Sequence, residues 1–523
     1  MGGIFIRYKV FLISILSALL LFCGCTKKET VQPEDESVKQ ENTEDTQKEP
    51  VEEEQYYTNY NATIEFVPET YSFKTIEKIM YKNTTGKKQN ELYMNVYANA
   101  FTENAEQLPY LLEYENAIFK NGKSYMDFNI SSLTVGGKEV TYSINGTSLC
   151  IQLSEPLEKD AQTEITIQFE TSIPDMHYDI GRNQNVIWEG NILPVMAVYD
   201  NSGWNKSEYY PLGDSIYNDI GNYMIAVKTP ENYDVIATGS EIINIDNGVK
   251  TTVIEAKFTR DFAFAIGSGM LNKSVQTDVS GVKINLYYYT YDDEKANAIL
   301  NRAKETLEYY IETLGSYPYS HIDIVECSLY DNKDVQFTGI AFIDESWFMP
   351  ETDINTAMLN FNLGKQWFSE IIGSNGVKEP WLRAGFEKFL QRLFVYGEYG
   401  IDDAMEIEYA SLKTALASEK HIELHNGLDT YKTKESFENI QVRKAAMMMY
   451  ALYKEVGSEK FHDIIKEYCL KYSFKNITSN EFFNLSEDIY GKSLYSLFND
   501  WVNGNKLPKV NFEKITDETE NLE

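Results

Sequence analysis

The chain has 523 residues, of which 43% are hydrophobic and 14% aromatic, so it can bury the cores of several domains. Its formal net charge of −33 argues against nucleic acid as a partner, because a phosphate backbone binds basic surfaces. The charge bears on solubility and non-specific contacts, and it leaves the fold open.

The N-terminus reads as a targeting segment. Arg7 and Lys9 precede an apolar run at residues 10–22, which has the length of a signal peptide and is too short for a stable membrane span. The run ends in LFCGC, which resembles a bacterial lipobox. That resemblance implies a signal peptide at residues 1–24, cleavage before Cys25 and a lipid on the Cys25 sulfur. Secretion without a lipid is the alternative.

Residues 25–56 are predicted to be a disordered acidic tether. Residues 26–56 contain eleven acids and four lysines, with almost no apolar side chain. Such a segment cannot bury enough surface to offset its chain entropy, and its self-repulsion should extend it. We expect it to hold the folded part away from the membrane, and we expect residues 506–523 to be a C-terminal tail.

Residues 57–270 alternate between apolar and polar side chains, which is the pattern of half-buried strands. Gly136-Gly137 and Asn145-Gly146 interrupt this alternation, as the turns of β-hairpins do. We therefore predict a β-sandwich over these residues.

The period changes to that of helices in residues 271–505. Apolar residues from Ala296 to Leu314 fall on one helical face, and Gly315 follows as a C-cap. Further helices are predicted at 355–373, 382–397, 402–418, 438–456, 458–471, 479–486 and 493–503. The chain is thus predicted to be a multidomain α+β protein, with a sandwich followed by a mainly helical domain.

Several short segments resemble one known family in their order and spacing. They are NSGW at 201–204, YPLGD at 210–214, RDFAF at 260–264, GSYPY at 315–319, QWF at 366–368 and WLRAGF at 381–386. Over residues 60–505 the chain resembles the gluzincin zinc aminopeptidases, which include membrane alanyl aminopeptidase and leukotriene-A hydrolase. The resemblance implies a sandwich followed by a thermolysin-like, mainly helical peptidase domain.

In that family the motif HExxH, eighteen further residues and a glutamate bind zinc. The two histidines lie at i and i+4 on one helical face and so reach one ion. The glutamate between them takes a proton from the zinc-bound water. The resemblance also implies a glutamate that holds the amino end of the substrate and a tyrosine that stabilises the oxyanion.

This sequence has different residues at those positions. The QWF segment places the motif at residues 361–365, which read FNLGK, and the third ligand position is Ala384 after eighteen residues. Phe361, Lys365 and Ala384 thus stand at the ligand positions, and Asn362 stands at the position of the general base. A phenyl ring, an ammonium and a methyl group offer no lone pair to a metal, and an amide accepts no proton at neutral pH.

The same frame places Gln336 at the amine-binding position and Val442 at the position of the oxyanion tyrosine. Asn362, Ala384 and Gln336 are neutral where the family has carboxylates. This is physically coherent, because uncompensated carboxylates in a low-dielectric cleft would destabilise the fold. We expect Lys365 to pair with Glu370, with Glu387 or with a backbone carbonyl.

The five histidines offer no obvious replacement site. His421 and His425 have i, i+4 spacing, but they precede Asn426-Gly427, so we expect them in a surface loop. The other three histidines are His177, His321 and His462.

These residues predict an inactive pseudopeptidase, lipid-anchored through Cys25 on the extracytoplasmic face of the cell membrane. We expect the old cleft to bind a peptide or protein partner, with no cofactor. Two alternatives remain open. One is a zinc-dependent aminopeptidase with displaced ligands, and the other is a structural or transporter-associated lipoprotein.

Overall fold

The computed structural model describes residues 56–206, 208–330, 335–349 and 356–513; within residues 356–361 the only side chain that it describes is that of Leu359. The predicted signal peptide, Cys25, the predicted tether up to residue 55 and residues 514–523 lie outside the described residues, as does the side chain of Phe361. Tyr56–Glu523 is one compact unit, and the architecture below is that of this unit.

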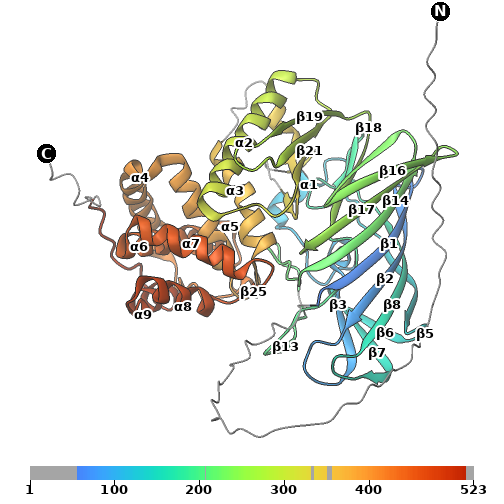
Figure 1. Ribbon diagram of the computed structural model, residues 1–523, viewed down its shortest axis with the longest axis horizontal. Helices are drawn as coiled ribbons and strands as arrows, with labels where there is room; N and C mark the ends of the chain where they lie inside the picture. Colours follow the sequence, from blue (N-terminus) through green and yellow to red (C-terminus); the bar gives the residue numbers. More distant parts are fainter. Residues whose placement is uncertain (1–55, 207, 331–334, 350–355, 514–523) are drawn as a thin grey trace, which may run out of the picture. The chain divides into compact units, whose positions relative to one another are not determined.

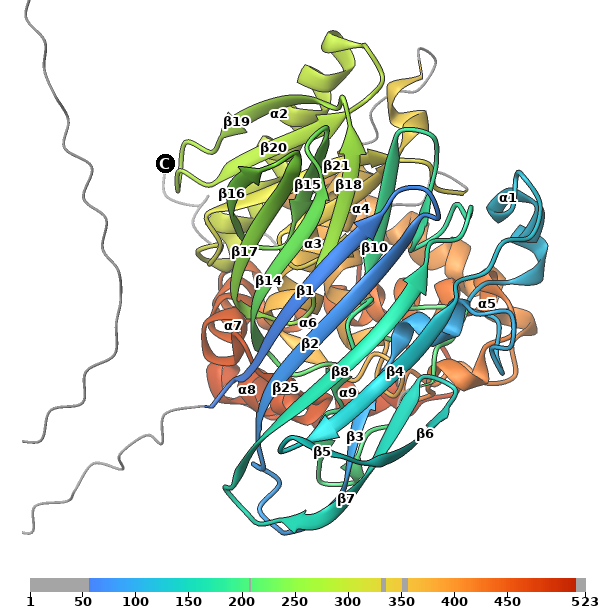
Figure 2. The ribbon, with the colours of Figure 1, turned by 90° about the vertical axis from the view of Figure 1, so that its right-hand side faces the viewer.

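The largest sheet in the described residues has eight strands, and Figure 2 shows it face on. Nearly all its neighbouring strands are antiparallel, but β1 and β14 are parallel. In spatial order the strands are β16 (Ser240–Asp246), β17 (Val249–Thr259), β14 (Gly221–Pro230), β1 (Thr58–Val67), β2 (Ser72–Lys82), β8 (Gln162–Ser172), β4 (Phe128–Val135) and β5 (Lys138–Glu139).

Two four-stranded sheets pack against one face of the large sheet and complete the sandwich. The three sheets share one core of buried apolar side chains, which includes Ile64, Phe73, Ile167, Leu92, Leu149 and Phe264. One sheet has the order β15 (Tyr233–Ala237), β18 (Ala263–Ser268), β10 (Val186–Gly190) and β9 (Gly181–Arg182). The other has the order β11 (Val195–Met196), β3 (Gln89–Asn95), β7 (Ser148–Leu157) and β6 (Thr141–Asn145).

The turns predicted at Gly136-Gly137 and Asn145-Gly146 join β4 to β5 and β6 to β7 as antiparallel pairs. Gly136, Gly137 and Gly146 lie in these turns with φ between 55° and 75°, whereas Asn145 is the last residue of β6 and the second turn is Gly146-Thr147. Since L side chains rarely adopt such values, glycine is suited to these positions.

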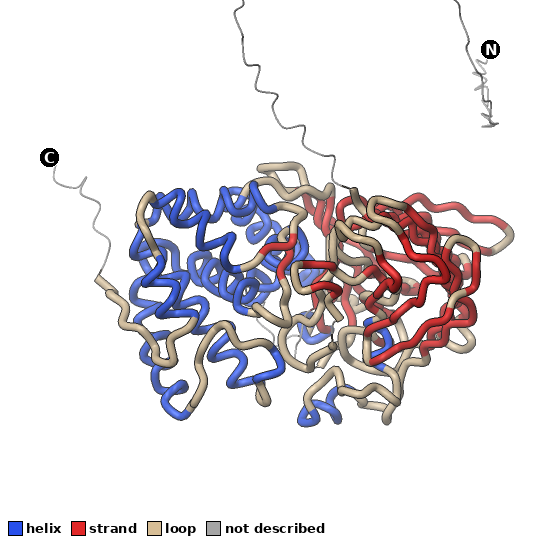
Figure 3. The backbone as a smooth tube through the Cα atoms, turned by 90° about the horizontal axis from the view of Figure 1, so that it is seen from below, coloured by secondary structure: helices blue, strands red, loops and turns tan. Residues whose placement is uncertain are grey.

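A five-stranded mixed sheet connects the sandwich to the helices. Its order is β19 (Leu271–Gln276), β20 (Lys283–Tyr288), β21 (His321–Cys327), β23 (Ile340–Asp344) and β22 (Val335–Phe337). Ile322 and Ile324 face the helical core, whereas Val325 and Cys327 pack with Trp188 and its neighbours on the sandwich side. Figures 1 and 3 show the strands gathered at one end of this unit and the helices at the other.

The helices enclose a second apolar core, which includes Leu307, Tyr310, Trp367, Phe389, Met448 and Ile465. The longer helices are α2 (Asp293–Leu314), α3 (Thr356–Lys365), α4 (Trp381–Ala415), α6 (Ala445–Val456), α7 (Ser458–Tyr472), α8 (Ser479–Tyr490) and α9 (Tyr495–Val502). Shorter helical segments are η1 (Tyr97–Phe101), η2 (Leu112–Tyr114), α1 (Glu115–Ile118), η3 (Glu345–Phe348), η5 (Leu416–Ser418), η6 (Leu428–Thr430) and α5 (Lys434–Phe437). No helix in the described ranges has both the length and the apolar character needed to cross a membrane.

Three helical features have clear sequence causes. The side chain of Asp292 caps α2 by accepting a hydrogen bond from the Lys295 backbone N–H at 2.9 Å, and Gly315 ends the helix with φ 106°. The predicted face from Ala296 to Leu314 is buried, although Ile311 within it is half-buried. Gly397 has non-helical backbone angles inside α4, near the break between two predicted helices.

Two segments predicted as ordinary helix are π-helical. They are η4 (Gln366–Ile371), which continues α3, and η7 (Glu438–Lys444), which precedes α6. Periodicity of apolar residues does not separate one π turn from an α turn, so the sequence analysis missed both. Such turns often occur at functional sites.

The guanidinium of Arg260 joins the sandwich to the helical domain. Arg260 is 2% exposed and follows the last residue of β17. It donates hydrogen bonds to the oxygens of five residues: the backbone carbonyls of Asn218 (2.7 Å), Glu370 (3.0 Å), Ile371 (3.4 Å) and Lys475 (3.3 Å), and the side chain of Asn476 (2.6 Å). A Cβ atom at Gly373 would lie 2.2 Å from this guanidinium, so the position favours glycine.

The sandwich core also contains buried carboxyl groups. Glu77 of β2 is fully buried between Ala62 and Ile167 on the neighbouring strands, and neither carboxyl oxygen has a hydrogen-bond partner in the structure. Burial raises the pKa of Glu77 well above its ordinary value, so the neutral acid is favoured. Glu189 of β10 is buried in the same way, and its pKa is raised for the same reason.

We predict that Arg260→Lys lowers the free energy of unfolding by about 3 kcal/mol, because an ammonium cannot replace a planar fork and leaves buried carbonyls unpaired. Chemical denaturation followed by circular dichroism measures the change. Arg302→Lys is the matched control, since Arg302 is an exposed residue that pairs with Glu305 one turn along the same helix. A loss no greater than that of the control would contradict the role of the guanidinium.

We predict that Glu77→Gln makes stability less dependent on pH. With a raised folded pKa, Glu77 contributes stability that is full below its unfolded pKa and is lost as the pH rises toward the folded pKa. The slope in that window is about 1.4 kcal/mol per pH unit for one proton, and glutamine removes it. Denaturation midpoints measured between pH 5 and 8 test this. Glu65→Gln is the control, because Glu65 is an exposed glutamate on β1. Parallel pH profiles for the wild type and Glu77→Gln would refute it.

Candidate functional site

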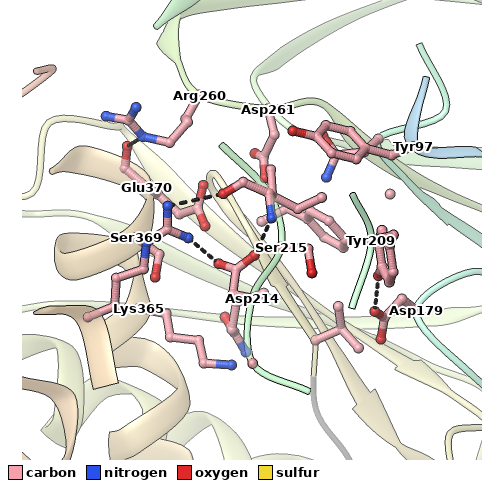
Figure 4. A pocket seen from close by; sticks show the side chains of 18 of the residues that line it. Tyr97, Asp179, Tyr209, Asp214, Ser215, Arg260, Asp261, Lys365, Ser369 and Glu370 are labelled. Atoms are coloured by element: carbon pink, nitrogen blue, oxygen red, sulfur yellow. Dashed lines mark hydrogen bonds and ion pairs between the residues drawn. The ribbon is translucent and has the colours of Figure 1, made fainter. Parts of the chain in front are cut away.

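A polar pocket, here called the cleft pocket, lies where the sandwich meets the helical domain (Figure 4). Its walls come from the end of β10, residues 213–216, Arg260 with Asp261, β22, η4 and α4. Its cavity volume is about 100 Å³. Since residues far apart in the sequence form these walls, the pocket depends on the correct seating of the two domains.

Arg383 of α4 fixes one wall. Its guanidinium pairs with the carboxylate of Asp214 and donates to the backbone oxygen of Ile216 at 3.0 Å. It also donates to the Ser374 hydroxyl at 3.2 Å. The Arg383 side chain is 6% exposed and that of Asp214 is 42% exposed, so the ion pair is shielded from water on the arginine side, and it holds the 213–216 segment against α4.

Thr338 connects two carboxyl groups of the opposite wall. Its backbone N–H donates to Asp261 at 2.9 Å, and its hydroxyl donates to Glu370 at 3.1 Å. Burial raises the pKa of Asp261 to about 6, and it raises that of Glu370 well above its ordinary value. Burial thus favours the protonated form of both carboxyl groups relative to a solvent-exposed acid.

The π-helical turn of η4 brings three side chains to the cleft pocket. Lys365, Ser369 and Glu370 all line it, and they stand at i, i+4 and i+5. In an α-helix the i+5 residue would point away from residue i, whereas a π turn closes its hydrogen bonds at i+5. Figure 4 shows Lys365 extending toward the space below Asp214.

A second pocket, here called the lysine pocket, adjoins the first and shares Lys365, Ser369, Asp214 and Arg383 with it. Its cavity volume is about 160 Å³, and Ala384 and Glu387 also line it. The structure thus places Lys365 and Ala384, two of the three residues predicted at the family's ligand positions, around one small space. The side chain of Phe361, the third, is outside the described residues.

The remaining residues predicted for the site are more scattered. Gln336 of β22 lines the cleft pocket. Asn362 is 5% exposed on α3, and Val442 is half-buried in η7; neither contributes to the lining of these two pockets. Their assignment to the base and oxyanion positions therefore stays a prediction.

The chemistry of Lys365 and Ala384 does not fit a zinc site. Zinc in proteins takes lone pairs from cysteine, histidine, aspartate or glutamate, and neither residue has one to give at neutral pH. Within the described ranges no group of three or more such side chains is arranged to hold a metal ion. The carboxyl groups in the lining of the lysine pocket are those of Asp214 and Glu387, and Asp214 is already paired with Arg383.

Glu387, one of the partners that the sequence analysis expected for Lys365, lines this pocket together with Lys365. It is 2% exposed and accepts a hydrogen bond from the Ser369 hydroxyl at 3.3 Å. Burial raises its pKa to about 7, although the positive charge of Lys365 lowers it. Lys365 and Glu387 thus attract each other electrostatically, as the expected pairing of Lys365 requires. The i, i+3 spacing from Ala384 on one helix could have indicated this position.

Asn191 and Asp214 were also missed as pocket residues. Asn191 directly follows β10, and nothing in its local sequence distinguishes it from a loop asparagine. Asp214 belongs to the YPLGD segment that carries the family resemblance, so its place near the cleft could have been inferred from that segment.

The histidines lie away from both pockets. His421 and His425 are exposed and lie in a loop, as predicted. His177 is buried and bonds through Nδ1 to the Ser328 hydroxyl at 2.7 Å. His321 lies 3.8 Å from Asp323, and His462 lies 3.8 Å from Glu398.

Comparisons with known proteins agree with this fold. Residues 298–501 match the Peptidase family M1 domain. The probable aminopeptidase 2 of Sulfurisphaera tokodaii is 24% identical over 420 residues, which cover 75% of this chain and 51% of that protein. Aminopeptidase M1-D of Oryza sativa subsp. japonica is 20% identical over 307 residues, or 55% of this chain and 35% of that protein. The chain thus spans about a third to a half of the length of these curated relatives.

Solved structures cover more of the chain. The M1 zinc metallopeptidase of Deinococcus radiodurans aligns with a TM-score of 0.62 and 12% identity, over 87% of this chain and 96% of that one. A two-domain M1 zinc metallopeptidase variant bound to L-tryptophan aligns with a TM-score of 0.60 and 13% identity, over 87% and 96%. Residues 298–501 are therefore a peptidase family M1 domain, and the described chain has the two-domain fold of the gluzincin zinc aminopeptidases that its sequence resembles.

Proposed function

We propose that the protein is a lipid-anchored pseudopeptidase: an M1 peptidase fold that no longer hydrolyses peptides and that binds a peptide or protein partner in its cleft. The observation that carries the proposal is the position of Lys365 and Ala384 on one small pocket, at two places where the family has zinc ligands. An ammonium there repels a metal cation, and a methyl group offers it nothing.

The surroundings of Lys365 support the same proposal. Glu387 and Asp214 line the lysine pocket, and Arg383 already compensates Asp214. The charge of Lys365 lowers the pKa of Glu387, which means that the ionised carboxylate is stabilised by the lysine. The Lys365 ammonium therefore places a positive charge of the protein itself close to the position where the family binds a metal.

The positions of the other substitutions fit a binding role. Gln336 lines the cleft pocket with an uncharged amide, and the family spacing predicts the amide of Asn362 at the position of the general base. With no metal ligand and no base, no hydroxide is generated at neutral pH. The cleft itself persists, with aromatic side chains of Tyr97, Phe101 and Tyr209 in its lining.

We predict that the purified protein binds far less than one equivalent of zinc and releases no amino acids from aminoacyl-p-nitroanilides. The variant with Phe361→His, Lys365→His and Ala384→Glu should bind about one equivalent, because it restores three ligands at the family spacing. Elemental analysis after dialysis measures the metal, and Lys365→Met, which removes the charge without adding a ligand, is the control.

Two outcomes would contradict the proposal. Stoichiometric zinc in the wild type, with hydrolysis that a chelator abolishes, would favour an aminopeptidase with displaced ligands. A folded triple variant without zinc would show that the three positions do not converge. The third possibility, a structural or transporter-associated lipoprotein, predicts that no ligand is bound by the cleft.

We further propose that lipid on Cys25 holds the protein at the extracytoplasmic face of the cell membrane. The sequence LFCGC at the end of an apolar run supports this, and the acidic segment after it would serve as a tether.

We predict that Cys25→Ser abolishes incorporation of labelled palmitate and moves the protein from the membrane to the soluble fraction of a bacterial host. Cys23→Ser is the matched control, because it changes a neighbouring cysteine and leaves Gly24-Cys25 intact. Labelling that survives Cys25→Ser, or is lost only with Cys23→Ser, would refute the anchor site.

A further inference from the structure

We infer that the cleft pocket recognises an uncharged peptide amide, in an acylated or internal peptide segment, through the side chains of Asn191 and Gln336. This inference rests on the proposed function, since it assumes that the ligand is bound and not cleaved. It specifies the chemical class that the pocket takes.

Both side chains are buried and lack hydrogen-bond partners within the part of the chain that the structure describes. Asn191 is 4% exposed and Gln336 is 8% exposed, and the amide oxygen and nitrogen of each are without a partner. Both residues line the cleft pocket. A buried amide left unpaired is costly, and two of them on one pocket are best satisfied by a ligand.

Strand geometry fixes the two amides relative to each other. The backbone N–H of Asn191 donates to the Phe262 oxygen at 3.2 Å, and Gln336 pairs with Ala341 in the five-stranded sheet. The end of β10 touches β22 closely, because a Cβ atom at Gly190 would lie 1.9 Å from the ring of Phe337. Rigid elements thus hold both side chains in place, as a preorganised binding site requires.

A primary amide carries two donors and one acceptor group, and a peptide unit offers one of each. Asn191 and Gln336 can therefore each take a carbonyl and an N–H from an extended chain. Sugar hydroxyls could meet the same groups, so glycan binding is an outcome that the test must exclude.

The charges of the pocket disfavour a free amino terminus. Lys365 presents a positive charge to the pocket, and Gln336 offers no negative one. The four carboxyl groups in the lining already accept protein hydrogen bonds: Asp214 from Arg383, Asp261 from the Thr338 backbone, Glu370 from the Thr338 hydroxyl and Asp179 from the Tyr209 hydroxyl at 2.7 Å. An ammonium group would lose its hydration beside Lys365 and would have to share carboxyl groups that already have protein partners, whereas an acetyl or internal amide loses no charge hydration.

The test uses two randomised hexapeptide amide libraries, one N-acetylated and one with free amino termini, applied to the immobilised full chain at pH 7.5. We expect the acetylated library to be retained about tenfold better, by mass spectrometry of the eluate. Gln336→Glu should reverse the preference toward free amines, because it adds one carboxylate of the same shape. Gln336→Met should weaken retention of both libraries.

Gln168→Glu is the matched control, since Gln168 is an exposed amide on β8 outside the cleft pocket. Thermal unfolding of each variant shows whether it is folded. If Gln336→Glu does not fold, Asn191→Leu provides the second variant, and it should weaken retention of the acetylated library about tenfold.

Four results would overturn the inference: wild-type preference for free amines, no effect of the cleft variants, no retention of either library, or retention of an oligosaccharide panel in place of peptides. The failure of the proposed function is seen separately. Zinc content and released amino acids are measured on the same samples, and hydrolysis that a chelator abolishes would refute the pseudopeptidase without deciding which amino terminus is preferred.

Discussion

The buried guanidinium of Arg260 is the interaction on which the rest of the arrangement depends. It fills its donor sites with oxygens from the sandwich, from the end of η4 and from the segment before α8. A single charged group thereby ties three parts of the chain that are far apart in sequence. Because the cleft pocket has walls on both sides of this joint, a shift of Arg260 would move the pocket walls relative to one another.

The same joint explains why acidic groups are tolerated nearby. Asp261 and Glu370 sit beside a buried cation and share hydrogen bonds with Thr338, so neither carboxyl group is isolated. Arg383 likewise forms an ion pair with Asp214. The cleft thus combines buried acidic groups with the basic side chains of Arg260, Arg383 and Lys365.

Much of the fold could be predicted from the sequence because local signals are strong. The glycine turns at 136–137 and 145–146 lie between the expected strands, and the face of α2 from Ala296 to Leu314 is buried as its spacing indicates. The association of Lys365 with Ala384 followed from a family spacing, and both line one pocket. These inferences needed only neighbouring residues or a known motif.

Other features depend on contacts between distant segments, which no local pattern reveals. Asn191 has no distinctive neighbours, and it becomes significant only because β10 ends against β22. The burial of Glu77 contradicts what its charge suggests, since alternation on β2 places it inward between apolar strands. The π turns of η4 and η7 escape a helical pattern because one additional residue changes the phase without changing the composition.

That additional residue has a consequence for protein engineering. A π turn is equivalent to an α-helix with one residue inserted, so deleting one residue within 366–371 would rewind the segment and rotate everything before it by roughly 100° about the helix axis. Lys365 and Glu370 would then no longer share a face. Loop grafts or chimeras that splice this helix from an ordinary α-helical template would carry that rotation into the cleft, even when every residue on either side is kept.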